Sequence, residues 1–330
     1  MKATLLIMTA FVLSVPAGCQ PAAGKKESPG EPKELLTVDF QAGRTLRYKF
    51  VSGRKITVDW ETTPGTSRTG RSVSDKSSES LEVVMAYTPT EIDPFGLTKV
   101  EATCESVKVA RSKGPQRDAV DSLAGRTFTL AVGPTGRIED YSQLDELLKE
   151  IGKKAFRANT GRGRIKEPDM IGDFVATQWF LWDAVSSIEN PSEGVRAGQS
   201  WKSKLSVPAP MVMRKARDVL YTLDEIRPGE KGRLAVISSS YTIADSAPRN
   251  WPIPYSGTFQ VAGAFGFYRN YKMLSLEGRG EELFNIDSGR TEQYYQQYEI
   301  QLSASLLIPL AGANPKITIK QNLTTRLLED

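Results

Sequence analysis

The sequence predicts a mainly β protein with two helices (an α+β fold), in which two halves follow one plan. Three observations predict this fold. Apolar and polar residues alternate over most of the chain, three short blocks recur in the same order, and two segments between the copies have helical spacing instead. We expect duplicated, antiparallel, curved sheets that resemble a half-barrel, with the helices packed between or over them.

Alternation of this kind indicates strands with one buried face and one face in water, which is typical of antiparallel sheets. It covers residues 46–50, 56–60, 81–87 and 128–132 in the first half and 201–207, 259–265, 284–286, 298–302 and 317–319 in the second. Glycine-containing turns, such as residues 133–136 and 287–289, predict hairpins between strands.

Three blocks of the first half recur in the second. Residues 42–50 match 197–205, residues 87–94 match 221–228, and residues 136–143 match 289–296. Collinear matches indicate a tandem duplication, with residues 36–190 as the first β repeat and 191–330 as the second. Residues 61–80, rich in serine, threonine and glycine, have no counterpart in the second copy and predict an inserted polar loop.

Two helices are expected between the copies, over residues 142–157 and 169–188. The first has an apolar stripe at helical spacing that begins at Leu144 and runs to Ala155. The second has a broader apolar face, which predicts that it is covered on more than one side.

Residues 1–18 are typical of a secretory signal peptide. Lys2 supplies a positive charge, and residues 5–15 form an apolar run of eleven residues, too short to span a bilayer. Ala17, Gly18 and Cys19 then resemble the lipobox of bacterial lipoproteins, although Pro16 stands where that family usually has leucine. The resemblance implies cleavage after Gly18 and a lipid on Cys19; cleavage by the ordinary signal peptidase is the alternative.

Residues 19–35 contain proline, glycine, alanine and charged residues almost throughout, so they cannot bury surface and predict a flexible tether. Gln20, rather than aspartate, follows Cys19, which by the same resemblance implies sorting to the outer membrane where there is one. We therefore expect an exported protein, lipid-anchored in the bacterial cell envelope. Cys104, the other cysteine, is expected to be a buried core residue.

The composition excludes several classes of chemistry. The chain has no histidine, which excludes Ser-His-Asp and Cys-His catalysis and histidine-ligated zinc. With 43 Lys and Arg against 39 Asp and Glu, the net charge of +4 is too small to indicate nucleic-acid binding. Ser52 and Lys55 have the S-x-x-K spacing of penicillin-binding enzymes without the companion motifs. We predict no enzyme activity, no cofactor and no metal.

Two groups of residues are candidates for ligand contact. Aromatic residues of the second helix and of a glycine-rich strand would line a pocket for a hydrophobic ligand if the sheet curves around them: Trp179, Phe180, Trp182 and Phe265. Basic residues between the helices would contact anionic lipid headgroups or acidic glycans, or serve solubility alone: Arg157, Arg162, Arg164 and Lys166.

The repeated pattern of A-G-x-[S/T], Y-T-x-x-E-I and a G-R turn resembles a bacterial family of secreted or lipid-anchored proteins that has no assigned function. The likeness covers most of residues 36–330 and implies no active residue. By architecture, a curved sheet with a helix also resembles the lipoprotein carriers of the periplasm.

We expect a lipid-anchored envelope protein with a non-enzymatic binding or scaffolding role. Its expected partners are the membrane, through the lipid on Cys19, and a lipid or cell-wall component. One alternative is a periplasmic carrier of a lipid or a lipoprotein acyl chain in a curved-sheet pocket. A second is a glycan hydrolase based on two carboxylates, which requires two facing Asp or Glu side chains in a cleft.

Overall fold

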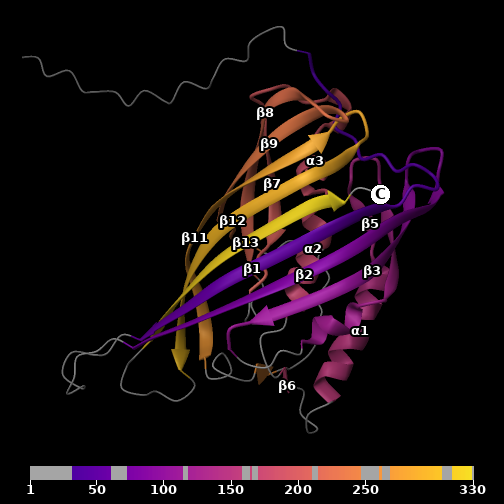
Figure 1. The fold of residues 1–330 in the computed structure, drawn as a ribbon. Coiled ribbons are helices and arrows are strands. Elements are labelled where there is room, and N and C mark those ends of the chain that lie inside the picture. Colours follow the sequence, from indigo (N-terminus) through magenta and orange to yellow (C-terminus); the bar gives the residue numbers. More distant parts are fainter. Residues whose placement is uncertain are drawn as a thin grey trace, which may run out of the picture. The chain divides into compact units, whose positions relative to one another are not determined.

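One antiparallel sheet of eleven strands carries the fold in the computed structural model (Figure 1). Its strands, in their order across the sheet, are β5 (Ile138–Asp140), β4 (Thr127–Val132), β3 (Thr98–Arg111), β2 (Val73–Ile92), β1 (Leu46–Trp60), β13 (Pro315–Leu328), β12 (Arg290–Leu306), β11 (Tyr268–Asn285), β9 (Gly232–Ile243), β8 (Ala216–Gly229) and β7 (Ser200–Ser206). Two short strands, β6 (Arg164–Ile165) and β10 (Gln260–Val261), pair with each other outside it. The mainly β prediction is confirmed.

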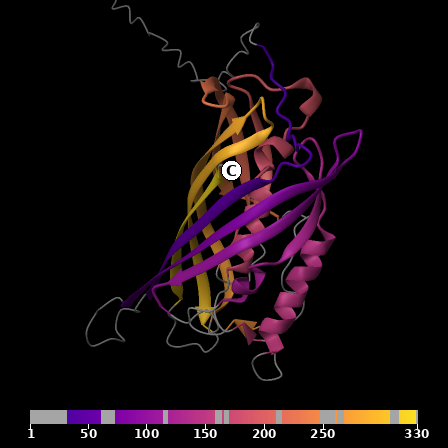
Figure 2. The same cartoon turned by 45° about the vertical axis from the view of Figure 1, so that its right-hand side comes forward.

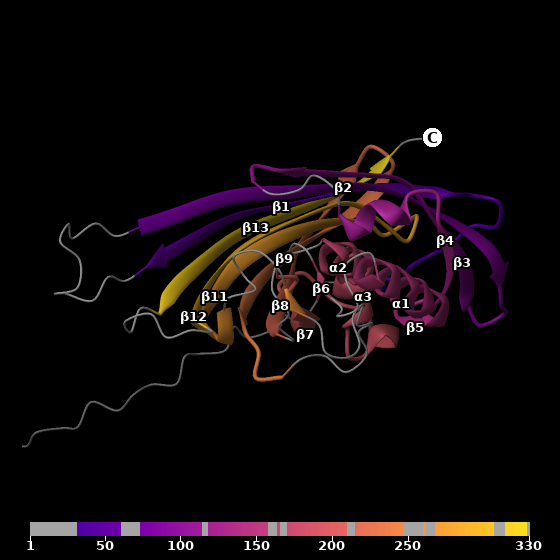
Figure 3. The same cartoon turned by 90° about the horizontal axis from the view of Figure 1, so that it is seen from below.

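The structure describes residues 32–60, 73–113, 118–157, 164–165, 170–209, 215–246, 260–261, 268–306 and 314–328. Residues Lys33–Asp330 form one unit, so the predicted repeats 36–190 and 191–330 share a single sheet instead of building one each. The sheet is curved and not closed, and the helices lie against its concave face (Figure 3).

The helices are α1 (Ser142–Arg157), α2 (Ile171–Phe180) and α3 (Asp183–Ser186), with short 3-10 helices η1 (Ala119–Leu123) and η2 (Pro191–Glu193). Helix α1 has the predicted bounds and packs beside β4 (Figure 2). The single helix expected over residues 169–188 is interrupted, because the backbone of Trp182 leaves the helical region (φ −126°, ψ 2°). Among the described residues, no helix is both long and apolar enough to cross a bilayer.

Alternating burial along the strands makes the concave face the core. On β1, Tyr48, Phe50 and Ile56 are at most 3% exposed, and every second residue of the strand faces outward instead. Helix α2 covers this face and is buried on nearly all sides, as its broad apolar surface predicts. Its Phe174 ring meets Phe128 edge-on at 6.3 Å.

Part of the expected loop over residues 61–80 is strand. β2 begins at Val73 and pairs with β1 residue for residue, from Val73 opposite Trp60 to Tyr87 opposite Leu46. The ladder hydrogen bonds stabilise the polar residues 73–80 as a strand, although their side chains favour a loop. Residues 61–72 lie outside the described residues.

The recurring blocks occupy corresponding positions in two meanders of five strands, β1 to β5 and β7, β8, β9, β11 and β12. Leu46 lies opposite Tyr87 in one, and Trp201 lies opposite Tyr221 in the other. Next to each of these residue pairs in the ladder, two hydroxyl oxygens lie 2.8 Å apart: those of Thr45 and Thr88 in the first meander, and those of Ser200 and Thr222 in the second. The meanders run across the sheet in the same direction with β13 between them, an arrangement that supports a tandem duplication.

The segment before β1, residues 33–40, contacts the turn at the start of the third recurring block in both copies. The Val38 amide donates to the Pro134 carbonyl at 2.8 Å, and the Asp39 amide donates to the Gly289 carbonyl at 2.9 Å. Glu34 pairs with Val195 as an isolated antiparallel bridge. Residues 34 and 35, which the sequence analysis placed in the tether, therefore already belong to the folded unit.

Replacing Gly289 with alanine should destabilise the protein more than replacing Gly198. Both glycines have positive φ (60° and 80°), which costs another residue about 1–2 kcal/mol. A Cβ at Gly198 would meet nothing within 4 Å, whereas one at Gly289 would lie 2.5 Å from the Asp39 nitrogen. In urea unfolding we expect Gly289→Ala to lose about 1–3 kcal/mol more than Gly198→Ala. Equal losses of stability in the two variants would show that residues 33–40 do not pack tightly against the turn at Gly289.

Candidate functional site

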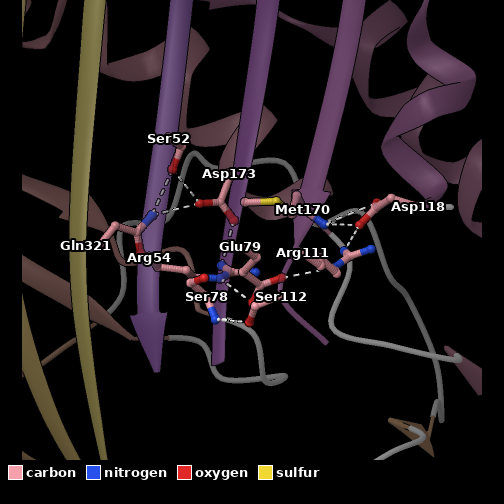
Figure 4. Close-up of polar contacts among 10 residues, drawn as sticks. All are labelled: Ser52, Arg54, Ser78, Glu79, Arg111, Ser112, Asp118, Met170, Asp173 and Gln321. Carbon is pink, nitrogen blue, oxygen red and sulfur yellow. Dashed lines mark hydrogen bonds and ion pairs between the residues drawn. The ribbon is translucent and has the colours of Figure 1, made fainter. Parts of the chain in front are cut away.

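A row of polar side chains crosses the concave face of the sheet, where its neighbours are apolar (Figure 4). Four strands place these residues opposite one another in the register: Arg111 on β3, Glu79 on β2, Arg54 on β1 and Gln321 on β13. Arg54, Glu79 and Gln321 are 2%, 7% and 3% exposed. We call these four residues the polar row.

The Arg54 guanidinium joins the polar row to helix α2. Its Nε donates to Glu79 Oε1 at 2.8 Å, and its Nη1 donates to Asp173 Oδ2 on α2, also at 2.8 Å. The second oxygen of Asp173 accepts from Gln321 Nε2 at 2.7 Å and from the Ser52 hydroxyl at 2.9 Å. Burial would lower the pKa of Arg54, but the charges of Asp173 and Glu79 raise it above its ordinary value, so the cation persists.

The polar row also fixes the chain on either side of helix α1. Arg111 Nε donates to Glu79 Oε2 at 3.2 Å, and Arg111 forms an ion pair with Asp118. Asp118 accepts from the Val120 amide at 2.9 Å, which caps η1, and from the Met170 amide just before α2. Every one of these groups is buried or nearly so, which indicates a positioning role in the fold.

A second buried cation, Arg217 on β8, lies in a cage of aromatic rings. Its guanidinium carbon is 4.3 Å from the centre of the Tyr241 ring, 4.7 Å from Tyr298 and 4.8 Å from Phe180. Its Nη2 donates to Gln296 at 2.5 Å, while Nε and Nη1 have no hydrogen-bond partner among the described residues. The rings stabilise the charge, with which no carboxylate forms an ion pair in the part of the chain that the structure describes.

Two buried carboxyl groups near this cage hold protons unusually tightly. Burial raises the pKa of Glu282 to about 8 and that of Asp183 to about 6. The Thr291 hydroxyl lies 2.7 Å from Glu282 Oε1 and 2.9 Å from the Leu181 carbonyl oxygen, and it has one hydrogen for both. A proton on Glu282 supplies the second hydrogen, so the geometry agrees with the raised pKa.

The outward face of the central strands is hollowed, with a volume of about 1120 Å³. Small residues and long polar residues line the hollow, together with Tyr298 and the four residues of the polar row. The small ones are Gly53, Ser78, Ser80, Ala110, Ser112, Ser275 and Gly278. The long ones are Lys55, Glu277, Arg279, Tyr295, Gln297, Glu299, Gln301, Lys320 and Asn322. We call this surface the outward hollow.

Charge in the outward hollow is unevenly compensated. Lys55 and Lys320 lie directly opposite each other on β1 and β13. Lys320 pairs with Glu299 at 3.2 Å, whereas Lys55 forms no ion pair with any residue that the structure describes. Two like charges opposite each other repel. The outward hollow can therefore receive an anionic group beside Lys55 and offers amide, hydroxyl and carboxylate groups around it.

The aromatic candidates for a hydrophobic pocket pack into the core instead. Phe180 is 1% exposed under Arg217, and Trp182 is 3% exposed with its ring 5.6 Å from Tyr87. Trp179 is half-buried against Tyr141, with ring centres 5.3 Å apart. None of the three lines the outward hollow. The fourth candidate, Phe265, lies outside the described residues.

The remaining candidates divide between the described and undescribed parts of the chain. Arg157 ends α1 and Arg164 belongs to β6, but the structure describes neither side chain; Arg162, Lys166, Gly18 and Cys19 lie outside the described residues. Ser52 faces the core and Lys55 faces solvent, so the S-x-x-K spacing does not bring them together. Cys104 is fully buried, as predicted, and burial raises the pKa of its thiol to about 12.

The sequence patterns did not lead us to predict the polar row, although the residues of β1 indicate it. Ser52 and Arg54 interrupt an inward-facing series of apolar residues that runs from Leu46 to Val58. Polar residues at inward positions of a strand require buried partners. Within the described ranges, no group of three or more Cys, Asp or Glu side chains is placed to hold a metal.

Glu282→Gln should flatten the dependence of stability on pH. Because the pKa of Glu282 is higher in the folded state (about 8) than its ordinary 4.5, the folded state binds this proton more tightly. Its contribution to stability is complete below pH 4.5 and is lost as pH rises to about 8, by at most about 1.4 kcal/mol per pH unit. Urea unfolding between about pH 6 and pH 8 measures this slope. In this range Asp183, whose pKa is about 6, has lost most of its proton, so Glu282 is the one of the two carboxyl groups that still titrates.

The adjacent, exposed Glu281 provides the control, and Glu281→Gln should keep the slope of the natural protein. The same slope in all three proteins would contradict a protonated Glu282 in the fold.

Comparison with known proteins yields no family: no protein-family model matches the chain, and no curated protein matches it in sequence.

Proposed function

We propose that the chain is a lipid-anchored protein of the bacterial cell envelope that binds a hydrophilic, partly anionic ligand in the outward hollow and catalyses no reaction. The observation that carries the proposal is the outward hollow itself, about 1120 Å³ in volume, with Lys55 at one side, a cation that forms no ion pair among the described residues. The anchor is supported by the Ala17-Gly18-Cys19 pattern after an apolar run.

The groups around the outward hollow suit a polymer of the cell wall. Sugar hydroxyls need both donors and acceptors, which Gln301 and Asn322 supply together. Carboxylates of amino sugars and peptides would pair with Lys55, and the half-buried Tyr295 ring offers an apolar surface to a sugar ring.

Binding is favoured over hydrolysis by the carboxylates of the same surface. Glu277 and Glu299 lie opposite each other on β11 and β12, as a glycan hydrolase would require. Such an enzyme needs one of its carboxyl groups to hold a proton. Hydrogen bonds from Gln301 and Lys320 instead lower the pKa of Glu299, and Glu277 is exposed to water.

A hydrophobic carrier is supported less well than a binding protein. The rings that would line its pocket, Phe180 and Trp182, are enclosed by Arg217, Phe40 and Tyr87. An acyl chain would have to displace these contacts in order to bind there.

Sedimentation with insoluble peptidoglycan tests the proposal. The natural protein, kept in mild detergent, should sediment with the polymer, and Lys55→Glu should lower its affinity about fivefold or more, which corresponds to about 1 kcal/mol. Lys316→Glu is the matched control, since Lys316 is exposed on β13 and does not line the outward hollow. Failure of the natural protein to sediment, or equal losses in the two variants, would overturn binding of this polymer in the outward hollow.

A further inference from the structure

β2 and β3 are joined by a short hairpin connection (Figure 1). Three large apolar side chains within six residues of this hairpin are exposed. Phe95 is 87% exposed, Ile92 41% and Leu97 39%. Scattered exposed apolar residues are ordinary, but a group at the end of a hairpin marks a surface that meets an apolar partner. We call Ile92, Phe95 and Leu97 the hairpin tip.

Hydrogen bonds hold the hairpin tip in one conformation. Asp93 Oδ1 accepts from the amides of Phe95 and Leu97, both at 2.8 Å, and the Asp93 amide donates to the Leu97 carbonyl at 2.9 Å. Gly96 has φ +86°, which closes the turn. The loop therefore presents the Phe95 ring to solvent in a fixed position instead of folding it back onto the sheet.

The charged side chains next to the hairpin tip form hydrogen bonds or an ion pair within the hairpin. The Asp93 carboxylate binds the two amides of the turn, and Glu91 lies 3.4 Å from Lys99. The end of the hairpin consequently offers an apolar surface, and the one negative charge that Asp93 adds is held against the loop amides. This favours an apolar environment over a strongly charged partner.

The hairpin tip lies in the corner of the sheet where the chain enters the fold. A Cβ placed on Gly96 would be 3.2 Å from Pro134, and the Pro134 carbonyl accepts from the Val38 amide at 2.8 Å. Residues 33–40 thus connect the end of the tether to this corner. Fourteen residue steps separate Cys19 from Lys33, so a lipid on Cys19 keeps Lys33 within at most about 50 Å of the bilayer surface.

We infer that the hairpin tip inserts into the surface of the bilayer that carries the anchor; this rests on the lipid anchor of the proposed function. Apolar side chains that are only partly moved out of water gain less than fully buried ones, so the hairpin tip alone would hold the protein at a membrane weakly. Stable attachment of a protein to a membrane takes two membrane-binding elements, such as a lipid chain and a second group that contacts the bilayer. The lipid on Cys19 retains the protein at the membrane, and the hairpin tip sets its orientation there.

Fluorescence quenching by brominated lipids tests the insertion. A chain of residues 19–330 is coupled through Cys19 to a maleimide lipid in phosphatidylethanolamine–phosphatidylglycerol vesicles, while Cys104 is fully buried and does not compete. In Phe95→Trp, bromolipids should quench the added fluorescence about twofold or more. Leu220→Trp is the matched control, because Leu220 is exposed (43%) on β8, and its added fluorescence should be unchanged.

Equal quenching in the two variants would overturn the inference. So would a shift of the Phe95→Trp emission that depends on protein concentration and occurs without vesicles, since a second copy would then cover the hairpin tip. Because the coupling supplies the anchor chemically, these outcomes do not depend on natural lipidation. The anchor is tested separately: in cells, Cys19→Ala should move the protein out of the membrane fraction, and its retention there would overturn the anchor alone.

Discussion

The Arg54 guanidinium, buried between Glu79 and Asp173, is the interaction on which the rest of the structure depends. A single curved sheet leaves one face that must be covered, and apolar contacts alone allow helix α2 to slide or rotate over it. A buried charge allows neither, because separating it from its partner costs about 3–5 kcal/mol. The 2.8 Å contact between Arg54 and Asp173 therefore determines where α2 lies on the sheet.

The strands that hold this ion pair also carry the outward hollow, which is lined mainly by their outward-facing residues. Lys55 follows Arg54 on β1, and Asn322 follows Gln321 on β13, so inward and outward residues alternate. Because the inward residues fix the strands, the outward positions are free to differ in size. Gly53 and the small residues of β2 and β3 open the surface there, and the proposed ligand binds against a rigid floor.

Much of the fold could be predicted from local patterns. Alternation predicted the antiparallel strands, helical spacing predicted α1, and the recurring blocks fall at corresponding places in the two meanders. The shared sheet could not be predicted, because it depends on β1 pairing with β13, and nothing in either strand specifies a partner more than 250 residues away.

The candidate site was predictable only in part, for two physical reasons. An aromatic face such as that of Phe180 and Trp182 has the same pattern whether it lines a pocket or fills a core, and here it fills the core. Ser52 and Arg54 revealed that β1 needs polar partners, but their main partner, Asp173, lies on a helix 119 residues beyond Arg54. The outward hollow depends on the sizes of residues from six strands, which only the register brings together.

The free energy of unfolding of Asp173→Asn tests most directly whether the buried ion pair holds helix α2 on the sheet. This account predicts a loss of about 3–5 kcal/mol, because Arg54 would keep its charge and lose a charged partner. The control is Glu91→Gln, which breaks the exposed pair with Lys99 and should cost less than about 1 kcal/mol. A loss in Asp173→Asn no larger than that of the control would contradict the account.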